Sequence, residues 1–310
     1  MTTTGTSVFN LDINDIVEEA YERCGLEVRS GYELRTARRS LNLLTIEWAN
    51  RGINLWTIEQ GQIPLYPNQS LYPLPVETID LLDQVVRTGT GTTQIDININ
   101  RISESTYSTI PNKNASGRPI QVWINRQSGE SNPTTATLTS TITSSATTIA
   151  VTGISALPSA GFIKIDSETI GYTAINGSNL VYCSRGQAGT TAASHTSGAA
   201  ITLQNLPNIN IWPTPNQGSA GNPYYTFVYW RMRRVQDAGS GTKTQDIPFR
   251  FIECMIAGLA YKLAAKQANL DPTRLAMLKA DYEQQWQLAA DEDREKASSR
   301  FVPRSLYYAS

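Results

Sequence analysis

The stretch from Ser30 to Gly52 constrains the fold more than any other part of the chain, because both of its ends carry helix signals. Ser30 and Glu33 have the spacing of a capping box, in which each side chain accepts a hydrogen bond from the other residue's backbone N–H. Gly52 follows as a C-terminal residue that can adopt a positive φ. Between these ends, apolar side chains recur every three or four residues and predict one long amphipathic helix. They are Leu34, Ala37, Leu41, Leu44 and Trp48.

Three further helices are expected near the two ends of the chain. The first, over about 12–24, is followed by Gly25, and its short link to the main helix predicts an antiparallel helix pair. The second starts near Pro248, and Asp271 and Pro272 announce the third as an N-cap and first-turn proline. Because each helix has one apolar face to bury, we expect helices from both chain ends to pack into one bundle. The expected faces are Ile13, Ile16, Val17, Ala20, Tyr21 and Cys24; Ile252, Met255, Ile256, Leu259, Ala260 and Leu263; and Leu275, Leu278, Tyr282, Gln285, Trp286 and Ala289.

Between these helices the hydrophobic period changes to that of β-strands. Residues 78–87 predict a mostly buried strand, and residues 94–102 alternate strictly, which places Ile95, Ile97 and Ile99 on one buried face. Residues 103–110 predict a short helix or turn. Further strands are expected within 54–65, 70–74, 118–124, 207–215 and 223–235.

The composition changes at Pro133, and from there to Asn205 the chain is dominated by Thr, Ser, Ala and Gly. Alternating short strands and an Asn176-Gly177 turn signal predict a small all-β module inserted into the chain. The strands on either side of it are expected to form one interrupted antiparallel sheet. The predicted class is therefore α+β, with a core domain of residues 1–132 and 206–310, an inserted module of residues 133–205, and an extended C-terminal tail of residues 298–310.

The composition and charge of the chain argue against several classes of function. The chain has 26 Lys and Arg against 27 Asp and Glu, a net charge of −1, which argues against a surface built to grip nucleic acid by phosphate neutralisation. Cys24, Cys183 and Cys254 lie far apart, so free thiols are expected rather than a metal site. The sequence predicts neither a membrane span nor an N-terminal signal peptide, and it indicates no cofactor.

Motifs for catalysis are scarce. His195 is the only histidine, and although Cys183 lies near it in sequence, no orienting acid is evident, so a turn histidine is the simpler interpretation. The run that starts at Gly186 lacks the lysine and spacing of a phosphate-binding loop. Helix surfaces account for the many carboxylates more simply than a glycosidase pair does. The carboxylates considered are Glu18, Glu19, Glu22, Glu33, Glu47 and Glu59. We therefore expect no enzyme and no catalytic residue.

Two arginine clusters and the tail are the remaining candidate sites. One cluster lies on the main helix and the other ends an aromatic strand, and each could contact phosphate or acidic partners. A solvated face or ion pairs between subunits is the simpler interpretation. The tail combines aromatic residues with arginines, which are typical interface anchors, and we expect it to become ordered on a partner. The clusters are Arg35, Arg38 and Arg39, and Arg231, Arg233 and Arg234; the tail residues are Arg300, Phe301, Arg304, Leu306, Tyr307 and Tyr308.

Several stretches resemble the head-to-tail adaptor, or connector, proteins of short-tailed bacteriophages (podoviruses). The likeness is to the tail tubular protein A type and the related DNA-packaging stabilisation, or head-completion, type. The most specific stretch is residues 12–56, DINDIVEEAYERCGLEVRSGYELRTARRSLNLLTIEWANRGINLW. Further stretches are 70–87, 117–127, 210–216, 225–239 and 247–266, so the likeness covers most of the chain outside the inserted module.

The resemblance implies a structural virion protein, assembled in the host cytoplasm as a ring that typically has twelve copies. The ring would join the portal protein to the tail nozzle, a tail tubular protein B-like protein, and its helical bundle would surround the DNA channel without sequence-specific binding. The β part would face the nozzle and help to seat tail fibres. By the same analogy the tail residues Arg300, Phe301, Arg304, Leu306, Tyr307 and Tyr308 are the candidate portal contacts. The alternatives are a tail nozzle or fibre-anchoring component and, less favoured, a peptidoglycan-degrading virion enzyme.

Overall fold

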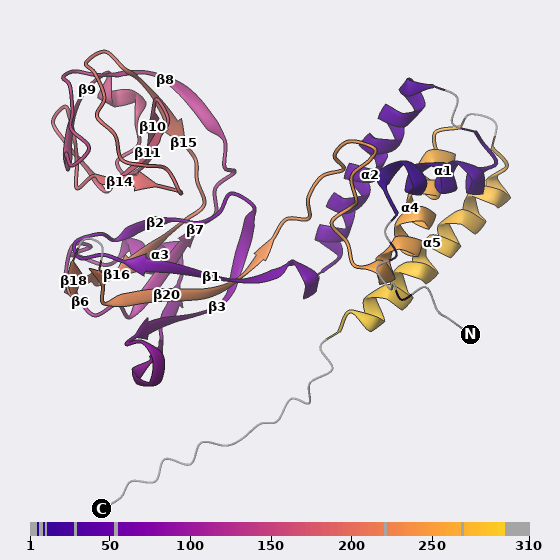
Figure 1. The fold of residues 1–310 in the computed structure, drawn as a ribbon, viewed down its shortest axis with the longest axis horizontal. Helices are drawn as coiled ribbons and strands as arrows, with labels where there is room; N and C mark the ends of the chain where they lie inside the picture. The colour runs from indigo at the N-terminus through magenta and orange to yellow at the C-terminus, as the bar shows by residue number, and fades with distance from the viewer. Residues whose placement is uncertain are drawn as a thin grey trace, which may run out of the picture. The chain divides into compact units, whose positions relative to one another are not determined.

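The computed structural model describes residues 5, 9, 11–27, 30–52, 55–219, 222–267 and 270–294 (Figure 1). The chain divides into two compact units, one formed by Met1–Thr57 and Val235–Ser310 and the other by Ile58–Arg234. The first unit is helical among its described residues, and the second is built mainly from strands. The α+β class expected from the sequence, with antiparallel sheets, is confirmed.

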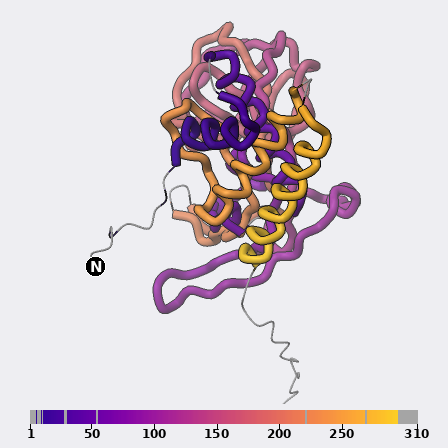
Figure 2. Tube along the Cα trace, turned by 90° about the vertical axis from the view of Figure 1, so that its right-hand side faces the viewer, coloured from indigo at the N-terminus to yellow at the C-terminus, as the bar shows by residue number. Residues whose placement is uncertain are grey.

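Four α-helices from opposite ends of the chain share one hydrophobic core in the first unit. In both views the indigo helix α1 lies beside the orange helix α4 (Figures 1 and 2). The helices are α1 (Ile13–Cys24), α2 (Gly31–Arg51), α4 (Ile252–Ala264) and α5 (Pro272–Glu292), with short 3-10 turns at Leu55–Thr57 and Phe249–Phe251.

Local side-chain chemistry sets the ends of these helices. The capping box expected at α2 is confirmed: the backbone N–H of Glu33 donates to Ser30 Oγ, and the backbone N–H of Ser30 donates to Glu33 Oε2 at 2.9 Å. Gly25 ends α1 with a φ of 72°, a left-handed conformation that costs glycine little. Asp271 caps α5 by accepting a hydrogen bond from the Thr273 backbone at 3.0 Å.

Helix α4 is the centre of this core, and it corrects two expectations. Its expected one-sided apolar face is wrong, because residues on all sides of the helix are buried. A helix that is apolar all round has to be covered from several directions, so α1, α2 and α5 each pack on α4. For the same reason α1 and α2 contact α4 far more than each other, and the expected antiparallel pair is wrong as the main packing. The buried residues of α4 are Cys254, Met255, Ile256, Ala257, Gly258, Leu259, Ala260, Leu263 and Ala264.

Buried polar groups tie α2 to α5 beside this core. Trp48 donates its indole N–H to the Tyr282 hydroxyl at 3.0 Å, and Tyr282 donates to Glu47 Oε1 at 2.9 Å. Glu47 also accepts hydrogen bonds from Arg51 and Lys262. Hydrogen bonds thus join the two helices, and the Trp48 indole and the Tyr282 hydroxyl both have a partner.

The second unit contains two four-stranded sheets, and each combines strands from before and after the inserted segment. The single interrupted sheet that we expected is therefore wrong, although the pairing across the insertion is present. One sheet has the order β1 (Ile58–Leu65), β20 (Tyr225–Arg233), β3 (Thr78–Thr88), β4 (Ile95–Asn98); the other has β2 (Leu71–Pro73), β16 (Asn208–Trp212), β7 (Gln121–Asn125), β5 (Asn100–Ile102). Smaller elements are α3 (Glu104–Ser108) and the two-stranded pairs β6 (Ser116–Gly117) with β17 (Thr214–Pro215) and β18 (Gly218–Ser219) with β19 (Asn222–Pro223).

Two expected strands differ from the structure, one in its pairing and the other in its burial. The alternating stretch 94–102 breaks after Asn98, since β4 pairs with β3 and β5 pairs with β7. Only Ile99, at the crossing point, is fully buried, whereas Ile95 on the edge strand β4 is 60% exposed. The strand β3 is half-buried rather than mostly buried, because Leu82 and its neighbour Asp83 face solvent. The alternation of apolar and polar residues in a strand does not by itself show which face of the strand will be covered by other parts of the protein.

The inserted segment forms an eight-stranded sheet with its own hydrophobic core. The expected Asn-Gly turn is present as the tight hairpin between Asn176 and Asn179, in which Gly177 has a φ of 61°. That the segment is a separate domain stays a prediction. The strand order is β12 (Ala174–Asn176), β13 (Asn179–Val181), β9 (Thr148–Thr152), β8 (Ser131–Leu138), β15 (Ala200–Gln204), β10 (Gly161–Ile165), β11 (Glu168–Tyr172), β14 (Ser184–Gln187).

The close packing around α4 predicts the effect of adding a side chain at Gly258. A Cβ there would lie 2.8 Å from Tyr282 Cε2 and 3.0 Å from both Leu44 methyl carbons, so α2 and α5 would have to move. We expect Gly258→Val to lower the free energy of unfolding by about 1–3 kcal/mol, as overpacking does in other cores. Chemical denaturation of Gly31→Val provides the control, because a Cβ at Gly31 meets no atom within 4 Å. Equal stability of the two variants would contradict this packing.

Candidate functional site

The arginine cluster on α2 lies on the solvent-facing side of the helix. Arg35 and Arg39 are exposed and Arg38 is half-buried. Burial lowers the pKa of Lys266, and the positive charges of Arg39 and Lys262 lower it further. The sequence analysis did not single out Lys262 in the last turn of α4 or Lys266 just beyond its end, although their spacing of four residues was a visible signal.

The second arginine cluster is largely engaged inside its own sheet. Glu59 on β1 lies opposite Arg231 on β20 and accepts hydrogen bonds from Arg231 at 2.8 Å and from Arg233. Burial works to raise the pKa of Glu59, but these two arginines outweigh it and the net shift is downward. Arg231 also donates to the Thr78 hydroxyl at 3.0 Å, while Arg234 at the end of the cluster is exposed. Two of the three guanidinium groups thus neutralise an acid of the same chain.

The candidate portal-binding residues Arg300, Phe301, Arg304, Leu306, Tyr307 and Tyr308 lie outside the described residues.

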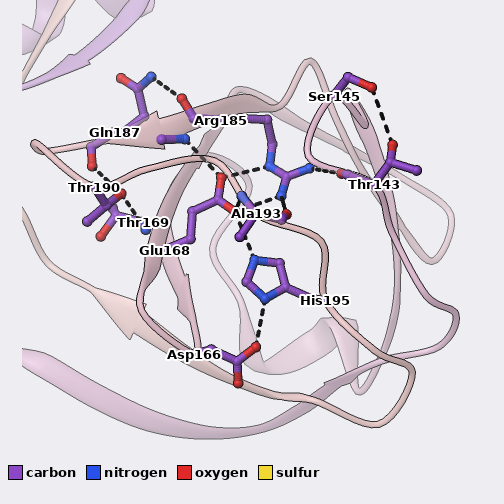
Figure 3. Close-up of polar contacts among 11 residues, drawn as sticks. Thr143, Ser145, Asp166, Glu168, Thr169, Arg185, Gln187, Thr190, Ala193 and His195 are labelled. Carbon is purple, nitrogen blue, oxygen red and sulfur yellow. Dashed lines mark hydrogen bonds and ion pairs between the residues drawn. The ribbon is translucent and has the colours of Figure 1, made fainter.

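The most elaborate polar site in the described chain surrounds Glu168 in the eight-stranded sheet (Figure 3). The Glu168 side chain has no solvent exposure, and Arg185 donates to both of its oxygens, at 2.9 and 2.7 Å. Backbone N–H groups of Gly186 and Ala193 donate at 2.9 and 3.0 Å, and His195 Nε2 lies 2.8 Å from Oε2. Burial works to raise the pKa of Glu168, but this donor set, led by Arg185, lowers it to about 2.

His195 bridges two carboxylates, which corrects its interpretation as a turn histidine without an acid partner. The residue is 3% exposed, and its Nδ1 lies 2.7 Å from Asp166 Oδ2 on the side opposite Glu168 (Figure 3). Carboxylates only accept hydrogen bonds, so both contacts are hydrogen bonds when both ring nitrogens carry a proton. Sequence could not reveal this site, because Asp166 and Glu168 are nearly thirty residues away along the chain.

This network fastens loops rather than exposing a reactive group. Arg185 donates in addition to the carbonyl oxygens of Thr143 and Ala193, so it connects three segments around β11 and β14. Cys183 is buried and donates to the Leu180 carbonyl oxygen, and burial raises the pKa of its thiol to about 12. A thiol in that state is a poor nucleophile, so the geometry gives no support to a Cys–His pair.

The carboxylates considered for glycosidase chemistry are held as structural acids. Glu33 belongs to the cap of α2, Glu19 pairs with Arg23 at 2.9 Å, and Glu47 and Glu59 each accept bonds from two cations. Burial raises the pKa of Glu47, but Lys262, Arg51 and Tyr282 outweigh it, so its net shift is downward. A general acid requires a shift in the opposite direction. Glu18 and Glu22 are exposed on α1.

Among the described residues, no group of three or more His, Cys, Asp and Glu side chains is arranged to hold a metal ion. No helix in the same part of the chain is long and apolar enough to cross a membrane.

Comparison with known proteins gives the class of the molecule. The family model of the SU10 adaptor protein matches residues 99–304, two thirds of the chain, including strands of both four-stranded sheets and the helices α4 and α5. The molecule is thus a bacteriophage head-to-tail adaptor, a structural protein of the virion. The chain belongs to the SU10 adaptor protein family. No curated protein matches the chain.

The buried pair of Glu168 and Arg185 predicts a large stability effect. Replacing Glu168 with Gln leaves the guanidinium of Arg185 buried without a counter-charge, which typically costs about 3–5 kcal/mol. We expect Glu168→Gln to lower the unfolding free energy of the eight-stranded sheet by that amount in urea titrations. Glu130→Gln is the matched control, because Glu130 is exposed beside the same sheet. A loss of similar size in both variants would refute a special role for Glu168.

The lowered pKa of Glu168 also predicts a pH dependence. A carboxyl group whose pKa falls on folding stabilises the native state above its unfolded pKa of 4.5, and this contribution is lost as the pH drops toward about 2. The stability difference between the natural chain and Glu168→Gln should therefore shrink as the pH falls from 4.5 to about 2. Unfolding free energies measured across this range test the expectation, and a difference independent of pH would contradict it.

Proposed function

We propose that twelve copies of this chain form a closed ring. The ring joins the portal to the tail nozzle of a short-tailed phage, and its central opening continues the DNA channel. The observation that carries the proposal is the family match over residues 99–304, which reaches into both units. The tail tubular protein A type is the specific relation proposed, from the resemblance over residues 12–56. We further propose that the protein performs no catalysis in this role.

In this proposal the helical bundle from both chain ends is the body of the ring. Its suitability comes from the shared core around α4, which holds segments from opposite ends of the sequence as one unit. Because this core is shared, the helices from the two ends of the chain would stay together within a subunit of the ring. The net charge of −1 is compatible with a channel wall, because dense phosphate binding would hinder the passage of DNA.

The C-terminal tail is the proposed portal contact. Purified chain mixed with portal rings of the same phage should add a layer to one face of the portal in electron micrographs, and the symmetry of that layer gives the copy number. Deletion of residues 298–310 should abolish the layer. Tyr224→Ala is the matched control, because Tyr224 is an exposed aromatic residue outside the tail.

Portals that stay bare with folded, full-length chain would overturn the adaptor ring and favour a nozzle or fibre-anchoring component. A layer that persists after deletion of residues 298–310 would place the portal contact elsewhere in the chain.

The α2 arginines are proposed to lie at the interface between subunits, with the DNA channel as the other possible location. We expect the double variant Arg35→Gln, Arg39→Gln to stop ring assembly, because exposed arginines often anchor such contacts. Analytical ultracentrifugation at two salt concentrations measures this. Rings that form normally but bind DNA more weakly would instead place these residues on the channel wall.

A further inference from the structure

A cavity of about 380 Å³ lies in the second unit, where the inserted sheet meets the sheet that contains β7. Its volume is within the range of small-ligand sites. The contact between the two sheets is well packed beside it: Leu71, Phe162 and Leu206 form a buried cluster, and Gln69 donates to Gln187 at 3.2 Å. The walls of the cavity are therefore formed before any ligand binds.

Two stacked aromatic rings are part of the lining of the cavity. Trp123 on β7 stacks on Tyr107 of α3, with ring centroids 5.0 Å apart and planes 21° apart. Both rings are half-buried, and α3 and β7 lie together in the β region of Figure 1. Stacking fixes the orientation of the rings, so they present a rigid surface with little entropy left to lose on binding.

The lining of the cavity is also rich in side-chain amides that lack partners. Within the described chain, the amides of Asn125, Gln127 and Asn205 make no hydrogen bond to another protein group. The Nε2 atom of Gln204 is buried without a hydrogen-bond partner, although its Oε1 accepts a hydrogen bond from Ser131. The unpaired amides of Asn125, Gln127 and Asn205 among the lining residues can bond a ligand that both donates and accepts hydrogen bonds.

The charge of the lining limits the ligand class. No Asp, Glu or Arg is among the described residues that line the cavity. Its one cation, Lys113, already donates to the carbonyl oxygens of Ser108 and Ile110 and lies over the Tyr107 ring. A phosphate or carboxylate ligand would lack the cations that such groups require. A purely apolar ligand would displace the water that hydrates these amides and would leave the amides without hydrogen-bond partners.

We propose that this cavity binds a neutral saccharide. Sugar hydroxyl groups both donate and accept hydrogen bonds, so they match amides, which offer two donors and an acceptor each. The C–H face of a sugar ring is apolar and packs on an aromatic surface such as Trp123. This binding site is separate from the contacts proposed for the ring and the portal, so either proposal can fail without the other.

Calorimetric titration of the full chain with four neutral oligosaccharides tests the proposal: cellohexaose, maltohexaose, mannohexaose and hexa-N-acetylchitohexaose. We expect at least one to bind with one site per chain. Trp123→Ala and Asn125→Ala should each weaken that binding at least tenfold. Gln60→Ala is the matched control, because Gln60 is an exposed amide on β1 outside the cavity, and it should leave the affinity unchanged.

Asn125→Ala and Gln127→Ala keep the test valid if Trp123→Ala fails to fold, because these amides hold no other part of the protein. Failure of all four saccharides to bind would overturn the proposal, as would binding that survives the cavity variants. The same titrations with a ten-residue oligothymidylate test the competing ligand class. Binding of that DNA, weakened by Trp123→Ala, in the absence of saccharide binding would identify the cavity as a site for nucleotide bases.

Discussion

The burial of α4 on all sides is the constraint on which the helical unit depends. A helix without a polar face is stable only when other helices cover it, and here the covering helices come from both ends of the chain. Gly258 permits the close approach, since its missing side chain leaves room for Tyr282 and Leu44. The N-terminal and C-terminal segments therefore depend on one another for their hydrophobic burial.

The inserted sheet is held by a different kind of interaction. Glu168 gathers donors from Arg185, His195 and two backbone N–H groups, and the low dielectric around it strengthens each bond. The hydrophobic core of this sheet consists largely of branched aliphatic side chains. The polar network adds to it by joining Arg185 to the carbonyl oxygens of Thr143 and Ala193 in the connecting loops. The only histidine of the chain thus has a structural position rather than a catalytic geometry.

The charged residues of the chain divide into two groups with different consequences for an adaptor. Glu47 and Glu59 form salt bridges with arginine and lysine side chains of their own unit, and these ion pairs stabilise the fold. Arg35 and Arg39 remain exposed on α2 and are available to a neighbour. A protein with a net charge near zero can in this way carry a local positive surface without binding DNA along its whole length.

The helices, their caps and the strand-rich character of the middle of the chain could be predicted from the sequence alone, because capping and hydrophobic period are local properties. The exposed α2 arginines were also predictable, since their spacing places them off the apolar stripe. Only the tertiary structure decided that α4 is central, that strand 94–102 splits between two sheets at Ile99, and that Glu59 neutralises Arg231. The network around Glu168 and the cavity beside Trp123 are likewise tertiary. Each of these depends on residues far apart along the chain, and no local pattern encodes which of them will meet.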